Sequence, residues 1–330
     1  MDRNQFILKD LVLGKSDIIE IGPSFAPVAS KRAGWATTIV DHTDRSGLIE
    51  KYGNTAELNL DAIEEVDVIW AGGPLESVFP TEKRGSYAAI IASHVIEHIV
   101  DPIAFFKSAD VMLGDDARIV LAVPDLRLCF DCSRPFSTTG QVIAAHREKR
   151  ILHSWSSVFD AGMYDTRPPS NAPSWQKKLQ FRPRLLNDLP SVWDSIDAYD
   201  DKNHDHYVDV HGWTFTPASF SLIMLELEAL KFCNWRITNM FERDELEFIA
   251  VLERPKKPLP NGLPLSERRL SLIKQRWYEL QQQANWMLGV SSESTEARAE
   301  FSGHEADLQS EIEKLKTTTK SLTMMSSPKI

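Results

Sequence analysis

The stretch from Tyr87 to Pro102, YAAIIASHVIEHIVDP, constrains the fold of this chain more narrowly than any other. Its first six residues form an apolar run, which is typical of a parallel strand buried on both faces. The run ends at Ser93 and His94, where we expect the strand to pass into a short helix that Pro102 stops. Because open α/β sheets bind ligands at the carboxyl ends of their strands, Ser93 and His94 are candidate ligand contacts.

The letters H-x-x-E-H in this stretch allow several interpretations. On a helix, His94, Glu97 and His98 would share one face, with Val95, Ile96 and Ile99 on the other. That arrangement matches the signature of one class of zinc peptidase, with two histidine ligands and a glutamate base. Alternatively, the histidines only cap and pack the helix. Because five-letter motifs often match by chance, the rest of the chain has to decide.

Length and composition exclude several classes of protein. A chain of 330 residues with net charge −10 and a pI near 5.4 is not expected to bind nucleic acid or anionic membranes nonspecifically. Of three cysteines, Cys129 and Cys132 form one C-x-x-C without a second pair, which favours reduced thiols. We find no signal-peptide core and no apolar run of the ~20 residues that a membrane span needs. The sequence predicts a soluble cytoplasmic protein.

Two further strand ends carry acids. In the segment SDIIEIGPSFAP, an apolar strand reaches Glu20 and then turns at Gly22 and Pro23. A glycine at such a turn lets the backbone approach a cofactor more closely than a β-carbon would permit. Asp41 ends the next strand, 21 residues after Glu20, and its spacing suits an acceptor for ribose hydroxyls. A dinucleotide enzyme would need the same acid, so Asp41 predicts nucleoside binding without naming the cofactor.

This series of strand ends resembles class I S-adenosylmethionine-dependent methyltransferases over about residues 16–125. Glu20 and Gly22 are similar to the first motif of that family, although Ser24 replaces its usual second glycine. The family often reads S-H-V-x-E-H-x-x-D-P after its fourth strand, and its loop after the third strand walls the adenine pocket. The resemblance implies that S-adenosyl-L-methionine contacts Glu20, Gly22, Pro23, Asp41, Gly72, Ser93 and His94.

The periodicity predicts an α/β fold with a doubly wound, Rossmann-like, seven-stranded methyltransferase sheet. We expect strands at 66–70, 87–92 and 117–123, a lead-in helix over 1–15, a helix over 103–113, and an antiparallel last strand from the hairpin 235–252. That hairpin disfavours dehydrogenases. The predicted methyltransferase domain spans 1–254, with an acceptor-side insertion at 126–215. A proline-rich linker at 255–264 and a helical tail at 265–330 follow, with a short coiled coil for self-association or a protein partner.

The insertion resembles a variant of the family that is associated with bacterial polysaccharide gene clusters. Phe130-Asp131 with Arg134, and Asp209-x-His211 before Thr-Pro-x-Ser-Phe, carry this resemblance. It implies a sugar or glycan hydroxyl as the methyl acceptor, with Asp209 and His211 in catalysis. Arg127 and Arg134 are expected either to contact the acceptor or to form surface ion pairs.

The predicted reaction is methyl transfer to a hydroxyl, which needs a base. His94 and His211 suit that role near neutral pH, with Asp209 as the next candidate. The histidines between 204 and 211 match no metal-ligand spacing, and we predict no metal. There are two alternatives: a protein that binds S-adenosylmethionine without transferring its methyl group, and the zinc peptidase.

Overall fold

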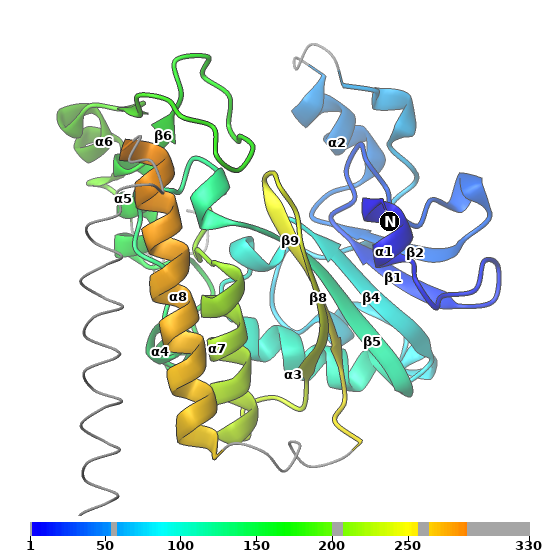
Figure 1. Ribbon diagram of the computed structural model, residues 1–330. Coiled ribbons are helices and arrows are strands. Elements are labelled where there is room, and N and C mark those ends of the chain that lie inside the picture. The colour runs from blue at the N-terminus through cyan, green and yellow to red at the C-terminus, as the bar shows by residue number, and fades with distance from the viewer. Residues whose placement is uncertain (1, 54–57, 200–206, 257–263, 289–330) are drawn as a thin grey trace, which may run out of the picture.

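The core of the protein is a seven-stranded sheet in the order β3-β2-β1-β4-β5-β9-β8 (Figure 1). The computed structural model describes residues 2–53, 58–199, 207–256 and 264–288. The strands are β1 (Asp17–Ile21), β2 (Ala36–Asp41), β3 (Val68–Ile69), β4 (Tyr87–Ser93), β5 (Leu113–Pro124), β8 (Arg236–Glu242) and β9 (Glu247–Glu253). The strands β1 to β5 pair in parallel, whereas β9 runs antiparallel between β5 and β8. The predicted fold class is therefore confirmed.

One face of the sheet carries the larger part of the core. Three helices cover it: α3 (Pro102–Met112), α4 (Thr139–Arg147) and α7 (Pro217–Ala229). Alternate strand residues such as Ile19 and Ile90 point to this face, and their neighbours Ile18 and Ile91 point to the other. Burial on both faces explains why the central strands read as continuous apolar runs.

The other face is covered by α1 (Arg3–Ile7) and by the segment between β1 and β2. The helix predicted over 1–15 ends after five residues, and that prediction was too long. Asp10 and Gly14 have positive φ angles of 65° and 69°, a backbone conformation that an α-helix cannot contain. Phe6 still packs as expected, with its ring stacked 5.0 Å from that of Phe241.

The segment between β4 and α3 differs most from the prediction. Instead of a helix, it forms a single 3₁₀ turn, η5 (Ile96–His98). The backbone at His94 is left-handed, with φ 54°, and the Glu97 carbonyl accepts hydrogen bonds from the amides of Gly212 and Trp213. Glu97 is buried beside Ile96, whereas His94 and His98 are half-buried, so the predicted polar helix face does not exist.

Other predicted boundaries shift by a few residues. The helix α3 ends at Met112, and β5 begins at Leu113, four residues before the predicted start. The remaining described helices are α2 (Arg45–Tyr52), α5 (Trp155–Met163), α6 (Leu189–Ile196) and α8 (Leu265–Leu288). Further 3₁₀ turns are η1 (Lys31–Ala33), η2 (Leu60–Ala62), η3 (Leu75–Val78), η4 (Thr81–Lys83) and η6 (Leu126–Leu128), and β6 (Thr166–Arg167) pairs with β7 (Arg184–Leu185).

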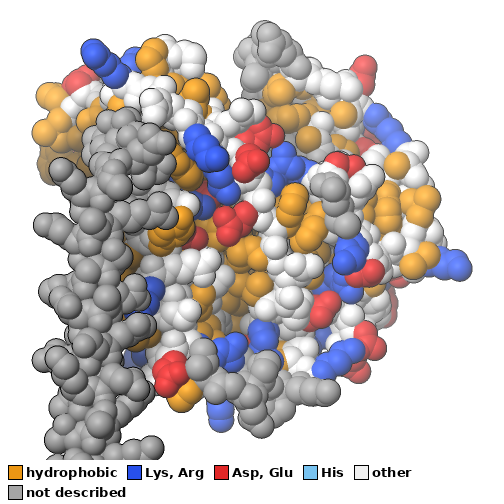
Figure 2. Space-filling view, viewed as in Figure 1, with side chains coloured by type: hydrophobic (Ala, Val, Ile, Leu, Met, Phe, Trp, Pro, Cys, Tyr) orange, Lys and Arg blue, Asp and Glu red, His pale blue; other side chains and the backbone are white. Residues whose placement is uncertain are grey.

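The helix α8 packs along α7 (Figure 1). Its buried Glu279 accepts hydrogen bonds from the Ala218 amide in the first turn of α7, at 3.0 and 3.3 Å. The predicted coiled coil beyond residue 288 lies outside the described residues, as do His204 and His206 and most of the proline-rich linker. Among the helices that the structure describes, none is long and apolar enough to cross a membrane. On the face in Figure 2, acidic and basic side chains are interspersed.

Candidate functional site

The carboxyl ends of β1, β2 and β4 lie side by side and bring most of the predicted site residues to one edge of the sheet. At the end of β1, the carboxylate of Glu20 accepts hydrogen bonds from the amides of Val28 and Ala29, at 2.6 and 2.9 Å. Burial raises the pKa of Glu20 to about 7, although these amide bonds oppose the rise. The side chain of Glu20 therefore fixes the backbone of the loop after β1 at Val28 and Ala29.

That loop has the backbone of a close-approach turn. Gly22 has φ 64°, and a β-carbon there would lie 2.9 Å from Cγ2 of Val95. Pro23 is buried directly after it. Ser24, which replaces the usual second glycine, also adopts a positive φ of 48°, and its hydroxyl donates a hydrogen bond to Tyr52. The departure from the motif thus keeps the backbone that the motif requires.

Asp41 at the end of β2 has one buried oxygen without a partner. Its side chain is 5% exposed, and Oδ1 accepts a hydrogen bond from the His42 amide at 2.8 Å. Oδ2 makes no hydrogen bond within the part of the chain that the structure describes. An unpaired buried carboxylate oxygen is costly, and a ribose hydroxyl would satisfy it. At Gly72 (φ 119°) a β-carbon would meet nothing within 4 Å, so the predicted adenine wall has open space beside it.

Ser93 and His94, at the end of β4, belong to a network that the sequence did not predict. Nε2 of His94 lies 2.9 Å from Oε2 of Glu247, and Arg3 donates hydrogen bonds to both Glu247 and the Ser93 hydroxyl. Burial would raise the pKa of Glu247, but the bonds from His94 and Arg3 outweigh it and lower the pKa to about 2. One nitrogen of His94 is therefore committed to Glu247.

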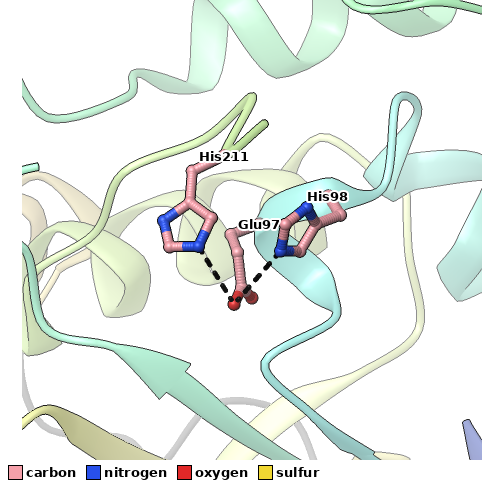
Figure 3. A group of neighbouring side chains, drawn as sticks. All are labelled: Glu97, His98 and His211. Atoms are coloured by element: carbon pink, nitrogen blue, oxygen red, sulfur yellow. Dashed lines mark ion pairs between the residues drawn. The ribbon is translucent and has the colours of Figure 1, made fainter. Parts of the chain in front are cut away.

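A second group comprises Glu97, His98 and His211, whose side chains point toward one another (Figure 3). The Nε2 atoms of His98 and His211 lie 4.0 and 3.9 Å from Oε1 of Glu97. On the opposite edges of the rings, Nδ1 of His211 lies 2.5 Å from Asp131, and Nδ1 of His98 lies 3.0 Å from Asp209. Each imidazole is thus held by an outer carboxylate and faces the same inner one.

The outer carboxylates are held as anions. Burial would raise the pKa of Asp131, but the hydrogen bond from His211 and the charge of Arg134 lower it. The hydrogen bond from His98 holds the pKa of Asp209 well below its usual range, with help from Lys51 at 3.1 Å. Asp209 is 52% exposed. A carboxylate that binds its proton so weakly is a poor base, so Asp209 positions His98.

The structure corrects the prediction for Arg127 and Arg134. Neither lies on the surface: both side chains are buried. Arg127 forms two hydrogen bonds to Asp125, at 2.9 and 2.6 Å, and Arg134 donates to Asp131 at 2.6 Å and to the His211 carbonyl at 2.8 Å. Both ion pairs are local in the sequence, whereas the hydrogen bond from Arg134 to the His211 carbonyl fixes the segment that carries His211.

Reasoning from sequence did not identify the carboxylates that hold the candidate histidines in place, such as Glu247 beside His94 and Asp131 beside His211. Glu97 and His98 were considered as parts of a zinc peptidase motif, which the 3₁₀ turn does not support, and of the family pattern S-H-V-x-E-H-x-x-D-P, but they were given no role in methyl transfer. Asp131 was noted for its resemblance but was given no role. The available signal was the count of acids and histidines near His211, since a buried imidazole needs a partner.

The sequence of this chain is similar to a known protein family. A family model described as "Methyltransferase domain" matches residues 15–182, just over half of the chain. No curated protein matches the sequence. A putative zinc-dependent alcohol dehydrogenase from Rhodobacter sphaeroides is 12% identical, with a TM-score of 0.40 over 76% of this chain and 89% of that one. A putative S-adenosylmethionine-dependent methyltransferase from Listeria monocytogenes is 10% identical, with a TM-score of 0.38 over 77% and 98%.

Proposed function

This chain belongs to the methyltransferase domain family, and from that premise we propose that it methylates a hydroxyl of a sugar or glycan-related acceptor. It is an enzyme, and its cofactor is S-adenosyl-L-methionine. The observation that supports a hydroxyl acceptor is the group at the end of β4, where His211 presents Nε2 beside Glu97 while Asp131 holds its Nδ1. Such a group can assist the loss of the proton that a hydroxyl must give up when it is methylated.

On the donor side, the residues present fit the cofactor. Oδ2 of Asp41 is free to accept hydrogen bonds from ribose hydroxyls, and the turn at Gly22 and Pro23 lets the backbone approach the ligand. Gly72 leaves space beside the predicted adenine wall. Bound S-adenosylmethionine supplies an electrophilic methyl group on a sulfonium, so the protein has chiefly to align the two reactants and exclude water.

On the acceptor side, the hydroxyl has to lose its proton. We propose that the group of Glu97, His98 and His211 binds the hydroxyl and increases its acidity. Of the three predicted catalytic residues, His211 alone belongs to this group, whereas His94 is bonded to Glu247 and Asp209 lies behind His98. The oxygen lone pair then attacks the methyl carbon, and the electrons of the broken C–S bond remain on sulfur.

Aromatic side chains in the insertion support a sugar acceptor. Trp155 stacks on Phe159 with ring centroids 5.1 Å apart and meets Trp193 edge to face at 5.9 Å. The ring of Trp193 is exposed, and α5 starts two residues after His153, which packs against Gly212 beside His211. Rings of this kind suit the apolar faces of sugar rings.

A direct assay tests the proposal. The full chain, S-adenosylmethionine and a panel of glycosides and nucleotide sugars should release S-adenosylhomocysteine, with the methyl group found on an acceptor oxygen by mass spectrometry. The host's surface glycan, compared with and without the gene, identifies the natural acceptor. Cofactor binding without release for any acceptor would favour a non-catalytic binding protein, and a methylated amine would overturn the hydroxyl assignment. We also propose a cytoplasmic location, which the three unpaired cysteines support.

A further inference from the structure

We propose that Glu97, His98 and His211 bind a divalent metal cation, which holds and acidifies the acceptor hydroxyl. This inference rests on the proposed function for the role of the cation, but not for its binding. It replaces the prediction from sequence that no metal binds. One ligand atom from each of the three residues, two imidazole nitrogens and a carboxylate oxygen, lies within 4.8 Å of the others.

The first observation is that the inner carboxylate is unsatisfied. Glu97 is 1% exposed, and neither of its oxygens has a hydrogen-bond partner in the described residues. A buried carboxylate without a partner costs several kcal/mol, roughly, unless a cation accompanies it. The imidazole nitrogens of His94, His98 and His211 that face Oε1 of Glu97 lie 3.7 to 4.0 Å from it, which is beyond hydrogen-bond distance.

The second observation concerns the orientation of the histidines. Nδ1 of His211 lies 2.5 Å from Asp131, and Nδ1 of His98 lies 3.0 Å from Asp209, so both rings turn Nε2 toward Glu97. Two imidazole nitrogens and a carboxylate oxygen thus converge on one point, as the ligand atoms of a metal ion do. Carboxylates that orient histidines from behind are typical of metal sites.

The balance of charges around Glu97 also favours a bound cation. The three carboxylates of Glu97, Asp131 and Asp209 face two permanent cations, Arg134 at 2.6 Å from Asp131 and Lys51 at 3.1 Å from Asp209. The group is therefore negative when its imidazoles are neutral, and both permanent cations neutralise the outer carboxylates. Neither of them pairs with Glu97.

The ligand set indicates the class of metal. Two imidazoles with one carboxylate suit first-row transition metals and zinc better than Mg²⁺, which prefers oxygen. Ligand atoms about 2.0 to 2.2 Å from one ion lie about 3 to 3.6 Å apart. The observed separations of 3.9 and 4.0 Å need only a small closure of side chains on binding. His94 is not part of the group: its Nδ1 lies 3.7 Å from Oε1 of Glu97, but only the ligand atoms of Glu97, His98 and His211 all lie within 4.8 Å of one another.

Three protein ligands leave coordination positions open for the acceptor oxygen. A bound cation lowers the pKa of a coordinated hydroxyl, whose proton is released to solvent. The alkoxide oxygen then forms the new bond to the methyl carbon, and the C–S bond breaks with its electron pair on sulfur. In this arrangement His211 is a ligand, and no protein base is needed.

Titration calorimetry of the chelator-treated full chain with ZnCl₂, MnCl₂ and MgCl₂ tests the proposal. We expect one ion per chain, with Zn²⁺ or Mn²⁺ bound at least about tenfold more tightly than Mg²⁺. Glu97→Gln and His211→Ala should each weaken binding by about a hundredfold or more, and Asp131→Asn by about tenfold to a hundredfold. Circular dichroism and S-adenosylhomocysteine binding should show that these variants are folded.

His146→Ala is the matched control. His146 also places Nδ1 2.8 Å from a carboxylate, that of Asp101, but its Nε2 meets Lys107 instead of a second ligand. Its loss should leave metal affinity unchanged. The proposal is overturned if no metal binds below millimolar concentration, or if His146→Ala weakens binding as much as Glu97→Gln. It is also overturned if binding is lost in His94→Ala but kept in His211→Ala, which would assign the H-x-x-E-H pair instead.

Activity separates this inference from the proposed function. Metal that binds as described, in a chain that releases no S-adenosylhomocysteine with any acceptor, supports the site and rejects the function. Transfer at an undiminished rate in the metal-free chain supports the function and overturns the role of the cation.

Discussion

The proposed donor and acceptor sides of the site are built in different ways. On the donor side, the polar groups are satisfied by nearby backbone, as Glu20 is by the amides of Val28 and Ala29, and one oxygen of Asp41 stays free. On the acceptor side, side chains from distant segments hold one another, as Asp131 and Arg134 hold His211. The donor side therefore depends on a few local residues, whereas the acceptor side depends on a network that the insertion closes.

The largest effect should come from the acceptor side. His211→Ala removes one of the two imidazoles that turn Nε2 toward the inner carboxylate, and we expect single-turnover methyl transfer to slow by roughly 10²–10⁴-fold. The affinity for S-adenosylhomocysteine should change little, because Asp41 and the turn at Gly22 lie on other strands. Rapid-quench measurement at saturating donor checks the rate. If His211→Ala transfers the methyl group at a rate close to that of the parent, His211 does not belong to the acceptor side as proposed.

The network at the end of β4 should contribute to stability in a pH-dependent way. The pKa of Glu247 is lowered to about 2 from 4.5, so its ionised form stabilises the fold above pH 4.5 and loses that contribution as the pH falls toward 2. Glu247→Gln should cost up to about 3 kcal/mol at pH 7, since tenfold in proton affinity is worth about 1.4 kcal/mol. Urea unfolding should show the cost shrinking below pH 4.5. A cost that is constant with pH would contradict this assignment.

The donor side should respond to a single residue. Asp41→Ala removes the free acceptor oxygen, and we expect affinity for S-adenosylhomocysteine to fall by about tenfold to a hundredfold, the value of a hydrogen bond to a charged group. Calorimetry measures this directly. If NAD binds to the parent and S-adenosylhomocysteine does not, the fold stands and the cofactor assignment fails.

The smallest effect should come from His94. Because its Nε2 is bonded to Glu247 and it lies outside the group of Glu97, His98 and His211, His94→Ala should slow transfer by less than about tenfold. Rate and donor affinity are measured on the same variant. If donor affinity collapses with the rate, His94 is a cofactor ligand. If the rate alone falls as far as in His211→Ala, His94 is the catalytic histidine.

The donor side could be predicted from sequence because its geometry is local. The strand that ends at Asp41 and the turn at Gly22 follow from apolar runs and from a spacing that parallel strands impose. The doubly wound sheet and the hairpin formed by β8 and β9 were predicted from patterns of the same kind. The lead-in helix was too long because the positive φ angles of Asp10 and Gly14 were not foreseen.

The acceptor side could not be predicted in the same way, because its contacts join segments far apart in the sequence. Asp131 and His211 are 80 residues apart. The expected helix does not form, because the backbone at His94 is left-handed and the Glu97 carbonyl accepts hydrogen bonds from the amides of Gly212 and Trp213. The side chain of Glu97 is buried as a result. Periodicity alone cannot reveal such a tertiary override.

One measurement tests the division between the two sides most directly. Donor affinity and single-turnover rate are determined for Asp41→Ala, His211→Ala and the double variant, with donor saturating in the rate assay. We predict that the double variant combines the weaker affinity of Asp41→Ala with the slow transfer of His211→Ala, without coupling between them. If His211→Ala loses donor affinity as steeply as rate, or if Asp41→Ala slows transfer at saturation as much as His211→Ala does, the account is contradicted.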